Sequence, residues 1–387
     1  MHEIVTPGGV PIKVWGPDPG EGSLAQARNL ALLPFAFSHI ALMPDAHVGY
    51  GMPIGGVLAS LGQVIPHAVG LDIGCGVRAW RTSIGAEEFS RVRDRILNDV
   101  QRSVPTSFEW HRTSQAERTT LFEDVPDVAP LRAEIDKATR QVGTLGGGNH
   151  FIEAQVDPDD IVWMMVHSGS RNLGKQMAEH YDAIAKADNR RNSSPVPPEW
   201  GLAHLATDST AGTEYLVVME FCMRFARENR RLMAEEVRRA IRRHFPDAAP
   251  GEDTDVHHNY AATEKHFDEQ VVVHRKGAVR AVDTVLVPGS MGTASYVCRG
   301  LGNPESFASC SHGAGRAMGR KAAMRAFPRA QVVQELEEVG VRVFKAKKHD
   351  LAAEAPRAYK DIEDVMRHQR DLVEPLVRLT PIGVVKG

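Results

Sequence analysis

Three glycine-rich segments of the sequence carry side chains that can ligate a metal ion. Asp72 and Cys75 share one glycine-rich turn. His150 follows a run of three glycines, and His167 ends an apolar run. Carboxylate, thiolate and imidazole donors from distant segments together favour a transition-metal ion over magnesium or calcium. The predicted ligands are Asp72, Cys75, His150, His167 and one of His257 and His258.

Each of these side chains also has an ordinary structural interpretation. A single histidine is more often a satisfied polar side chain than a ligand. A free cysteine is usually a small buried hydrophobe, although the position of Cys75 between two glycines weakens that interpretation. The convergence of several such residues at glycine-rich turns favours the metal centre.

Two later segments are typical of phosphate binding. Residues 287–295 offer backbone amides and hydroxyl groups in a turn that an anion can approach, but they lack the Gly-Lys-Ser/Thr ending of a Walker A loop. His312 stands before a Gly-x-Gly segment and Arg316. A neutral imidazole there can attack phosphorus while amides and a guanidinium hold the negative charge. The spacing fits equally well a helix-capping turn with an incidental histidine.

Strands joined by tight turns must position most of these residues. Between residues 4 and 83, short apolar or β-branched runs alternate with Gly/Pro turns. Further strands are expected at 151–155, 161–167, 270–274, 278–281 and 284–287, and a mixed, strand-like stretch at 330–345. Apolar spacing predicts helices at 86–104, 131–142, 174–189, 213–245, 312–326 and 362–372. Residues 107–130 are expected to form a mobile insertion or loop.

The predicted helix over 213–245 carries arginines on one face, which we call the arginine stripe. A row of this kind can follow a phosphate backbone. The interleaved Glu228, Glu235 and Glu236 can instead pair with it, which favours an ordinary solvated face. The stripe consists of Arg224, Arg227, Arg231, Arg238 and Arg242.

Composition narrows the class of protein. The 387 residues are 42% hydrophobic and 25% charged, which excludes a disordered, collagenous or coiled-coil chain. The net charge of −3 gives no global basic field, so any nucleic-acid contact must depend on local clusters. Four scattered cysteines favour a reducing compartment. With neither a signal peptide nor an apolar run of about 18 residues, we expect a cytoplasmic protein with no membrane partner.

The sequence resembles the RtcB family of RNA-splicing and repair ligases. The resemblance covers nearly the whole chain and excludes the arginine stripe and residues 107–130. The matching segments, in chain order, are 43–47, 70–77, 143–153, 167–171, 257–260, 275–278, 288–292, 312–316, 358–361 and 385–387.

The resemblance implies an α+β fold: one large domain over residues 1–387, with a β-rich core around a deep central metal and nucleotide cleft, peripheral helices, and a helical excursion at about 213–245. It also implies an enzyme that joins an RNA 3′-phosphate or 2′,3′-cyclic phosphate end to a 5′-hydroxyl end with GTP and Mn²⁺. The role would be RNA repair, tRNA splicing or both. The implied partners are these RNA ends and an archease-type activator.

The resemblance assigns roles to individual residues. Two Mn²⁺ ions would be held by Asp72, Cys75, His150, His167 and His258, with Cys75 bridging; His258 is chosen over His257 because the family's ligand directly precedes an asparagine. His312 would form a covalent GMP-histidine, oriented by Asp45, and pass GMP to the RNA as an RNA-(3′)pp(5′)G end. Glu153 and Lys386 would read the guanine edge. The implied nucleotide contacts are Asn149, His150, Phe151, Ile152, Glu153, His258, Asn259, Pro288, Gly289, Ser290, Met291, Ser295, His312, Gly313, Ala314, Gly315, Tyr359 and Lys386.

Two histidines stay outside these assignments. His67 precedes the metal loop and is either a hydrogen-bonding neighbour of a ligand or, as we favour, a structural side chain. His47 follows Asp45 and either supports the site or faces RNA.

Two other functions compete with the ligase. A metal-dependent hydrolase of RNA phosphate ends could use the same ions but needs no covalent nucleotide, so label from α-labelled GTP on His312 separates the two. An RNA-binding translation-rescue component would depend on the arginine stripe, and reversing the stripe's charge would then abolish RNA binding while guanylylation persists.

Overall fold

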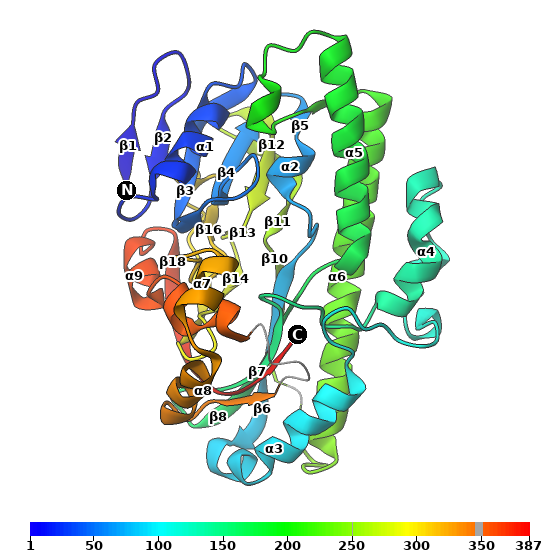
Figure 1. The fold of residues 1–387 in the computed structure, drawn as a ribbon, viewed down its shortest axis with the longest axis vertical. Coiled ribbons are helices and arrows are strands. Elements are labelled where there is room, and N and C mark those ends of the chain that lie inside the picture. The colour runs from blue at the N-terminus through cyan, green and yellow to red at the C-terminus, as the bar shows by residue number, and fades with distance from the viewer. Residues whose placement is uncertain (250, 345–350) are drawn as a thin grey trace.

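The structure is a computed structural model that describes residues 1–249, 251–344 and 351–387. Strands from all parts of the chain build two large sheets, and helices cover them (Figure 1). The expected mixture of helices and strands is thereby confirmed.

The first large sheet has six strands in the order β1-β2-β3-β4-β12-β11. Its strands β3 and β4 pair antiparallel, with Ile40 opposite Leu58, and are buried along most of their length. The bounds are β1 (His2–Ile4), β2 (Ile12–Val14), β3 (Ala36–His47), β4 (Ile54–Ser60), β11 (Asn259–His266) and β12 (Glu269–Lys276).

The second large sheet follows the order β10-β6-β8-β7-β18-β15-β14, with β17 added parallel to β18. Central strand β8 is almost wholly apolar and buried, as expected for a strand covered on both faces. The bounds are β6 (Gly76–Gly85), β7 (Phe151–Val156), β8 (Ile161–Ser168), β10 (Asp253–His257), β14 (Thr284–Val287), β15 (Ser295–Gly300), β17 (Arg342–Phe344) and β18 (Val373–Lys386).

Two small sheets complete the strands. One pairs β13 (Ala278–Arg280) with β16 (Ser309–Ser311), and the other pairs β5 (Gln63–Val64) with β9 (Leu205–Ala206). The pair β13 and β16 places the residue after β16, His312, beside the end of β12, because Gly277 alone separates β12 from β13.

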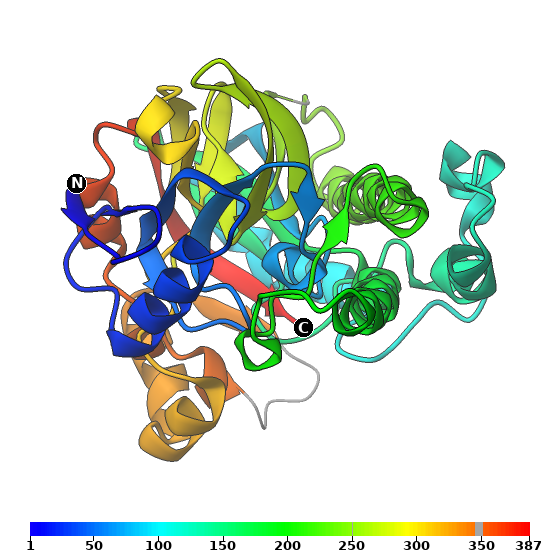
Figure 2. The same ribbon diagram turned by 90° about the horizontal axis from the view of Figure 1, so that it is seen from above.

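The longest helix, α6 (Thr210–Arg242), lies alongside α5 (Arg171–Arg191) and against strands of the second sheet (Figures 1 and 2). Its N-terminus is capped by the Ser209 side chain, and Phe221, Phe225 and Val237 are among the side chains that it buries. The other helices are α1 (Glu21–Ala31), α2 (Pro66–Val69), α3 (Ala86–Ser103), α4 (Ala129–Gln141), α7 (Arg320–Ala326), α8 (Arg329–Glu338) and α9 (Ile362–His368).

Two members of the arginine stripe form ion pairs with acidic side chains of the protein. Arg231 forms ion pairs with Glu228 and Glu235, and Arg238 pairs with Asp253. These pairs support the interpretation of the stripe as an ordinary solvated face. Arg224 and Arg227 are exposed.

Two element predictions need correction. The mixed, strand-like stretch expected at 330–345 begins with residues of α8, in which Val332 and Leu336 are buried at helical spacing, and forms a strand only in β17; residue 345 lies outside the described residues. The helix expected at 312–326 begins only at Arg320, since residues 312–319 form a loop in which Gly315 has a φ of 69°. Residues 107–130 are mostly loop, as expected, with short turns of 3₁₀ helix and a buried Leu121.

None of the helices among the described residues combines the length and apolar character that crossing a lipid bilayer requires.

Candidate metal and nucleotide site

The predicted metal ligands come from four places in the fold. Asp72 and Cys75 lie in the loop between α2 and β6, and His150 directly precedes β7. His167 lies on β8. His258 is the single residue between β10 and β11, where the chain leaves one large sheet for the other. The site therefore forms at the junction of the two sheets.

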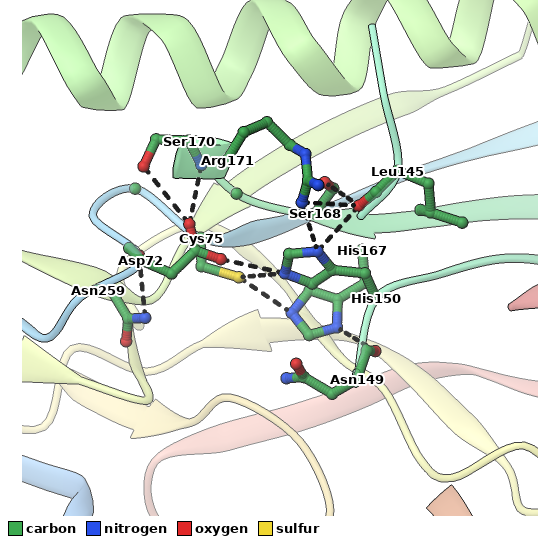
Figure 3. A network of polar contacts seen from close by, with 12 residues as sticks. Asp72, Cys75, Leu145, Asn149, His150, His167, Ser168, Ser170, Arg171 and Asn259 are labelled. Carbon is green, nitrogen blue, oxygen red and sulfur yellow. Dashed lines mark hydrogen bonds and ion pairs between the residues drawn. The ribbon is translucent and has the colours of Figure 1, made fainter. Parts of the chain in front are cut away.

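The ligand atoms converge on the Cys75 sulfur (Figure 3). Cys75 Sγ lies 3.5 Å from His150 Nε2 and 3.4 Å from His167 Nε2. His150 Nε2 lies 3.1 Å from Asp72 Oδ2. His167 Nε2 lies 3.4 Å from His258 Nε2. The structure thus brings all five predicted ligands together, and we call this group of side chains the metal cluster.

Backbone carbonyls orient two of the imidazoles. The Nδ1–H of His150 donates to the Leu145 carbonyl over 2.9 Å, and that of His167 donates to the Asn149 carbonyl over 3.2 Å. Both rings thereby turn Nε2 toward the cluster, and Nε2 is the nitrogen that a ring protonated only on Nδ1 offers to a metal ion. His257 points elsewhere: its Nδ1 contacts the Gly74 carbonyl and Arg230.

The donor chemistry fits a pair of metal ions. Asp72, Cys75 and His150 form one group of possible ligands and Cys75, His167 and His258 a second, so the thiol is common to both. Burial lowers the pKa of His167 and of His258, which keeps both rings neutral. Burial and Asp72 raise the pKa of the Cys75 thiol, so its thiolate requires a cation nearby. Shared thiolate and neutral imidazoles suit a transition-metal ion.

Arg171 braces the loop that carries His150, a role that the sequence analysis missed. Its guanidinium donates to the Leu145 carbonyl, to Thr144 Oγ1 and to the Ser107 carbonyl (Figure 3 shows the first contact). It crosses Gly146 so closely that a Cβ at that position would lie 1.7 Å from a guanidinium nitrogen. The run of glycines therefore makes room for an arginine.

His312 lies next to the metal cluster. Its ring centroid is 4.9 Å from that of His258. Its Nδ1–H donates to Asp45 Oδ2 over 2.6 Å, and its backbone N–H donates to the same oxygen over 3.1 Å. The fully buried Asp45 therefore fixes the ring and leaves Nε2 as the nitrogen that could act as a nucleophile.

The loop after His312 holds Asp45 in place. Gly315 packs so closely on β3 that a Cβ would lie 2.3 Å from the Asp45 carbonyl oxygen. The Lys360 ammonium donates to the carbonyls of Pro44 and Ala46, which flank Asp45, and the Lys360 N–H donates to the Gly315 carbonyl. Only a glycine fits at position 315.

A pocket of about 150 Å³ adjoins His312 and the metal cluster, and we call it the nucleotide pocket. It contains most of the predicted nucleotide contacts: Asn149, Phe151, Glu153, Pro288, Gly289, Ser290, Met291, His312, Gly313, Ala314, Gly315, Tyr359 and Lys386.

The other predicted contacts do not line this pocket. His150 and His258 belong to the metal cluster, and Ile152 lies in the hydrophobic core. Asn259 bridges the Asp72 carbonyl and the Gly277 N–H. The buried Ser295 hydroxyl accepts from the Gly289 N–H and from Gln155, so it supports the loop at the pocket wall.

Buried ionisable side chains line part of the pocket. Burial raises the pKa of Glu153 to about 8, against the opposing effects of a hydrogen bond from Gln155 and of nearby Lys386. The Lys386 ammonium lies 3.7 Å from a Glu354 oxygen, and β18 pairs with β7 so that Lys386 lies opposite Phe151. At neutral pH this carboxyl group is therefore mostly protonated, and a ligand that donates hydrogen bonds to it would favour its ionised form.

The pocket also contains residues that were not predicted as contacts. Glu354 binds Tyr359, Arg316 and Arg320 through its carboxylate. Arg316 was expected only to hold phosphate charge. Glu354 carried a weak signal in the sequence, since it is an isolated acid in an alanine-rich run. Its two arginine partners are far away in the chain, so spacing could not identify it.

The two unassigned histidines occupy different places. His67 Nδ1 lies 3.0 Å from Asp182 Oδ1, and the Tyr50 ring packs edge-on against it, as a structural side chain would. His47 lines the nucleotide pocket, and its Nδ1 donates to the Asp45 carbonyl over 2.9 Å.

A family model and several individual proteins match this sequence over nearly its whole length. The family described as tRNA-splicing ligase RtcB matches residues 26–134 and 120–387. The RNA-splicing ligase RtcB of Escherichia coli K12 is 36% identical over the full length of both chains. The tRNA-splicing ligase RtcB of Thermococcus kodakarensis is 34% identical over 94% of this chain and 91% of its own, and the RNA-splicing ligase RtcB of Mycobacterium tuberculosis is 34% identical over 94% and 100%. The chain belongs to the RtcB family of RNA ligases.

Proposed function

We propose that this protein joins an RNA 3′-phosphate or 2′,3′-cyclic phosphate end to a 5′-hydroxyl end, using GTP and Mn²⁺. The observation that carries the proposal is the imidazole of His312, with Asp45 on its Nδ1 and the metal cluster beside it. This arrangement supplies a nucleophilic nitrogen next to a place where phosphate charge can be neutralised.

The first step is guanylylation of His312. Its Nε2 attacks the α-phosphorus of GTP, the N–P bond forms, and the bond from that phosphorus to the leaving pyrophosphate breaks. The ring becomes positively charged in this step, and the Asp45 carboxylate stabilises that charge through the Nδ1–H.

Asp72, Cys75, His150, His167 and His258 would hold two Mn²⁺ ions. Bound there, the ions would neutralise phosphate charge and orient the phosphates for in-line displacement.

Glu153 supports the choice of guanine. Guanine presents two N–H donors side by side on one edge, and a buried carboxylate can accept both. Adenine lacks this pair of donors and would form neither hydrogen bond with Glu153, which disfavours adenine.

The RNA steps follow. Any 2′,3′-cyclic phosphate is first opened by water to a 3′-phosphate. An oxygen of that phosphate attacks the α-phosphorus on His312, the N–P bond breaks, and RNA-(3′)pp(5′)G forms. The 5′-hydroxyl of the second RNA attacks the 3′-phosphorus, and GMP leaves as the phosphodiester closes. The anhydride supplies the leaving group that an unactivated phosphate monoester lacks.

One experiment tests the proposal. Purified protein is incubated with α-labelled GTP and Mn²⁺, and then with RNA fragments bearing 3′-phosphate and 5′-hydroxyl ends. We expect label on the wild type and joined RNA, loss of both in H312A, and loss of joining when GTP or Mn²⁺ is omitted. Release of inorganic phosphate from RNA without labelled protein would overturn the proposal in favour of the hydrolase.

Two further parts of the proposal concern a partner protein and the cellular compartment. The proposed partner is an archease-type activator, which is tested by comparing RNA joining with and without it under multiple-turnover conditions. The four cysteines are free thiols, which favours a reducing compartment, and we propose the cytoplasm.

A further inference from the structure

A second, larger groove opens from the nucleotide pocket. Its volume is about 1030 Å³, and its lining includes residues at the start of α1 and residues of α7 and of the loop before it. Both cavities share His47, Ile54, Arg316 and Arg320, so the groove is continuous with the pocket that holds His312. We call it the basic groove.

Cationic side chains dominate its lining. They are Arg316, Arg320, Lys321, Arg325 and Lys360. Asp18 is the only acidic side chain among the described residues that line the groove, and its carboxylate accepts a hydrogen bond from the Gly20 N–H. The chain as a whole has a net charge of −3, so this concentration of positive charge is local.

Two of these cations are available to a ligand. Arg316 and Arg320 pair with Glu354, and Lys360 donates to backbone carbonyls. Lys321 and Arg325 are exposed and have no ion pair or hydrogen bond to any described residue. They are four residues apart on α7, which places both on one face of the helix, and both line the groove.

Much of the remaining lining consists of small residues. Gly20, Gly22, Ala46 and Gly319 leave space between α1 and α7, and His47 is the only aromatic ring among the described lining residues. A groove with cations but few rings can contact phosphates, whereas it offers few surfaces on which bases can stack.

We propose that the basic groove binds the sugar-phosphate backbone of the single-stranded RNA next to its reacting 3′ end, and guides the terminal phosphate to His312. This inference rests on the proposed function and names the surface that takes its RNA substrate. Because the contacts are to phosphates, binding is largely independent of base sequence.

The test removes the two free cations. Binding of a fluorescent single-stranded RNA with a 3′-phosphate is measured by anisotropy without GTP, for the wild type and for K321Q/R325Q. Each phosphate contact on a single strand contributes about 0.7 to the slope of log K against log salt, so the slope should fall by about 1.4. At about 0.1 M salt this corresponds to binding weakened on the order of 10- to 30-fold.

The matched control is R224Q/R227Q, which removes two exposed charges from the arginine stripe. The proposal predicts that this variant binds RNA within about twofold of the wild type. An equal loss of RNA affinity in both variants would attribute the effect to net charge and contradict the proposal. Unchanged RNA binding by K321Q/R325Q, or a loss of affinity only in R224Q/R227Q, would also contradict it.

Two additional measurements separate this inference from the proposed function. An unchanged melting temperature shows that K321Q/R325Q is folded. Labelling of wild-type His312 from α-labelled GTP tests the ligase mechanism, and absence of label would overturn that mechanism. The RNA-binding measurement would still test the basic groove in that case. If K321Q/R325Q raises the GTP concentration needed for labelling but binds RNA normally, the groove holds the triphosphate and the inference is wrong.

Discussion

Asp45 orients the His312 ring. Its carboxylate accepts the Nδ1–H over 2.6 Å from a fully buried position, so in the proposed mechanism it would select the reacting nitrogen and face the positive charge that develops on attack. Replacement by asparagine keeps the size of the side chain and removes the charge.

We therefore expect D45N to slow guanylylation of His312 by about 10²- to 10⁴-fold, by analogy with the acid of a catalytic triad. The rate of label transfer from α-labelled GTP measures it, with H312A as the unlabelled baseline. Thermal unfolding checks that the variant is folded. A rate within about threefold of the wild type would contradict this role for Asp45.

The raised pKa of Glu153 predicts that the free energy of unfolding depends on pH. Burial raises its pKa to about 8, above the ordinary value of a glutamate, so the native state binds this proton more tightly than the unfolded chain does. The stabilisation from the protonated carboxyl is complete below about pH 4.5 and is lost as the pH rises to 8.

E153Q stays neutral throughout this range. Urea unfolding of the nucleotide-free proteins at pH 5 and pH 8.5 should therefore show the wild type losing about 2–4 kcal/mol relative to the variant. A difference in free energy of unfolding that does not change with pH would show that Glu153 ionises in the native state as it does in water.

At the scale of elements, the last residues of β18 form part of the pocket wall. Lys386 lies near Glu354 and over the Phe151 ring, and Gly387 packs so closely on the glycine run that a Cβ would touch the Gly146 carbonyl. The strand thereby joins the C-terminus to the loop that carries His150.

Deletion of residues 386–387 should lower guanylylation at subsaturating GTP by more than about tenfold, because it removes a buried cation and opens the pocket to water. The same labelling assay over a range of GTP concentrations measures this loss. K386M serves as the comparison because it keeps the strand length. Full activity of the truncated chain would show that the end of β18 is dispensable.

The elements also show what the sequence could predict. Turns such as 70–76 were identifiable because glycine and ligand-type residues lie together within a few positions. The roles of Arg171 and Glu354 were not, since their partners at Thr144, Leu145, Arg316 and Arg320 meet them only after folding. The mixed, strand-like stretch expected at 330–345 contains a helix that the sequence analysis missed, because valine favours strands whereas the burial of Val332 and Leu336 fits helical spacing.

At the scale of the molecule, the metal cluster lies where the two large sheets meet. Cys75 precedes β6 and His167 lies on β8 of one sheet, whereas His258 begins the crossing to β11 of the other. Ions bound to these residues would connect the two sheets. Because the unfolded chain cannot assemble the same donors, metal binding should stabilise the whole protein.

Mn²⁺ at about 100 times its dissociation constant should then add about 2.7 kcal/mol to the free energy of unfolding, with EDTA reversing the gain. Both groups of ligands contain Cys75, so C75A should lose the rise in melting temperature and both tightly bound ions, as measured by thermal unfolding and by metal analysis. H150A changes only one group and should retain one ion. Two ions in C75A would contradict a shared thiolate, and an equal rise in melting temperature in C75A would show that Mn²⁺ stabilises the protein from another site.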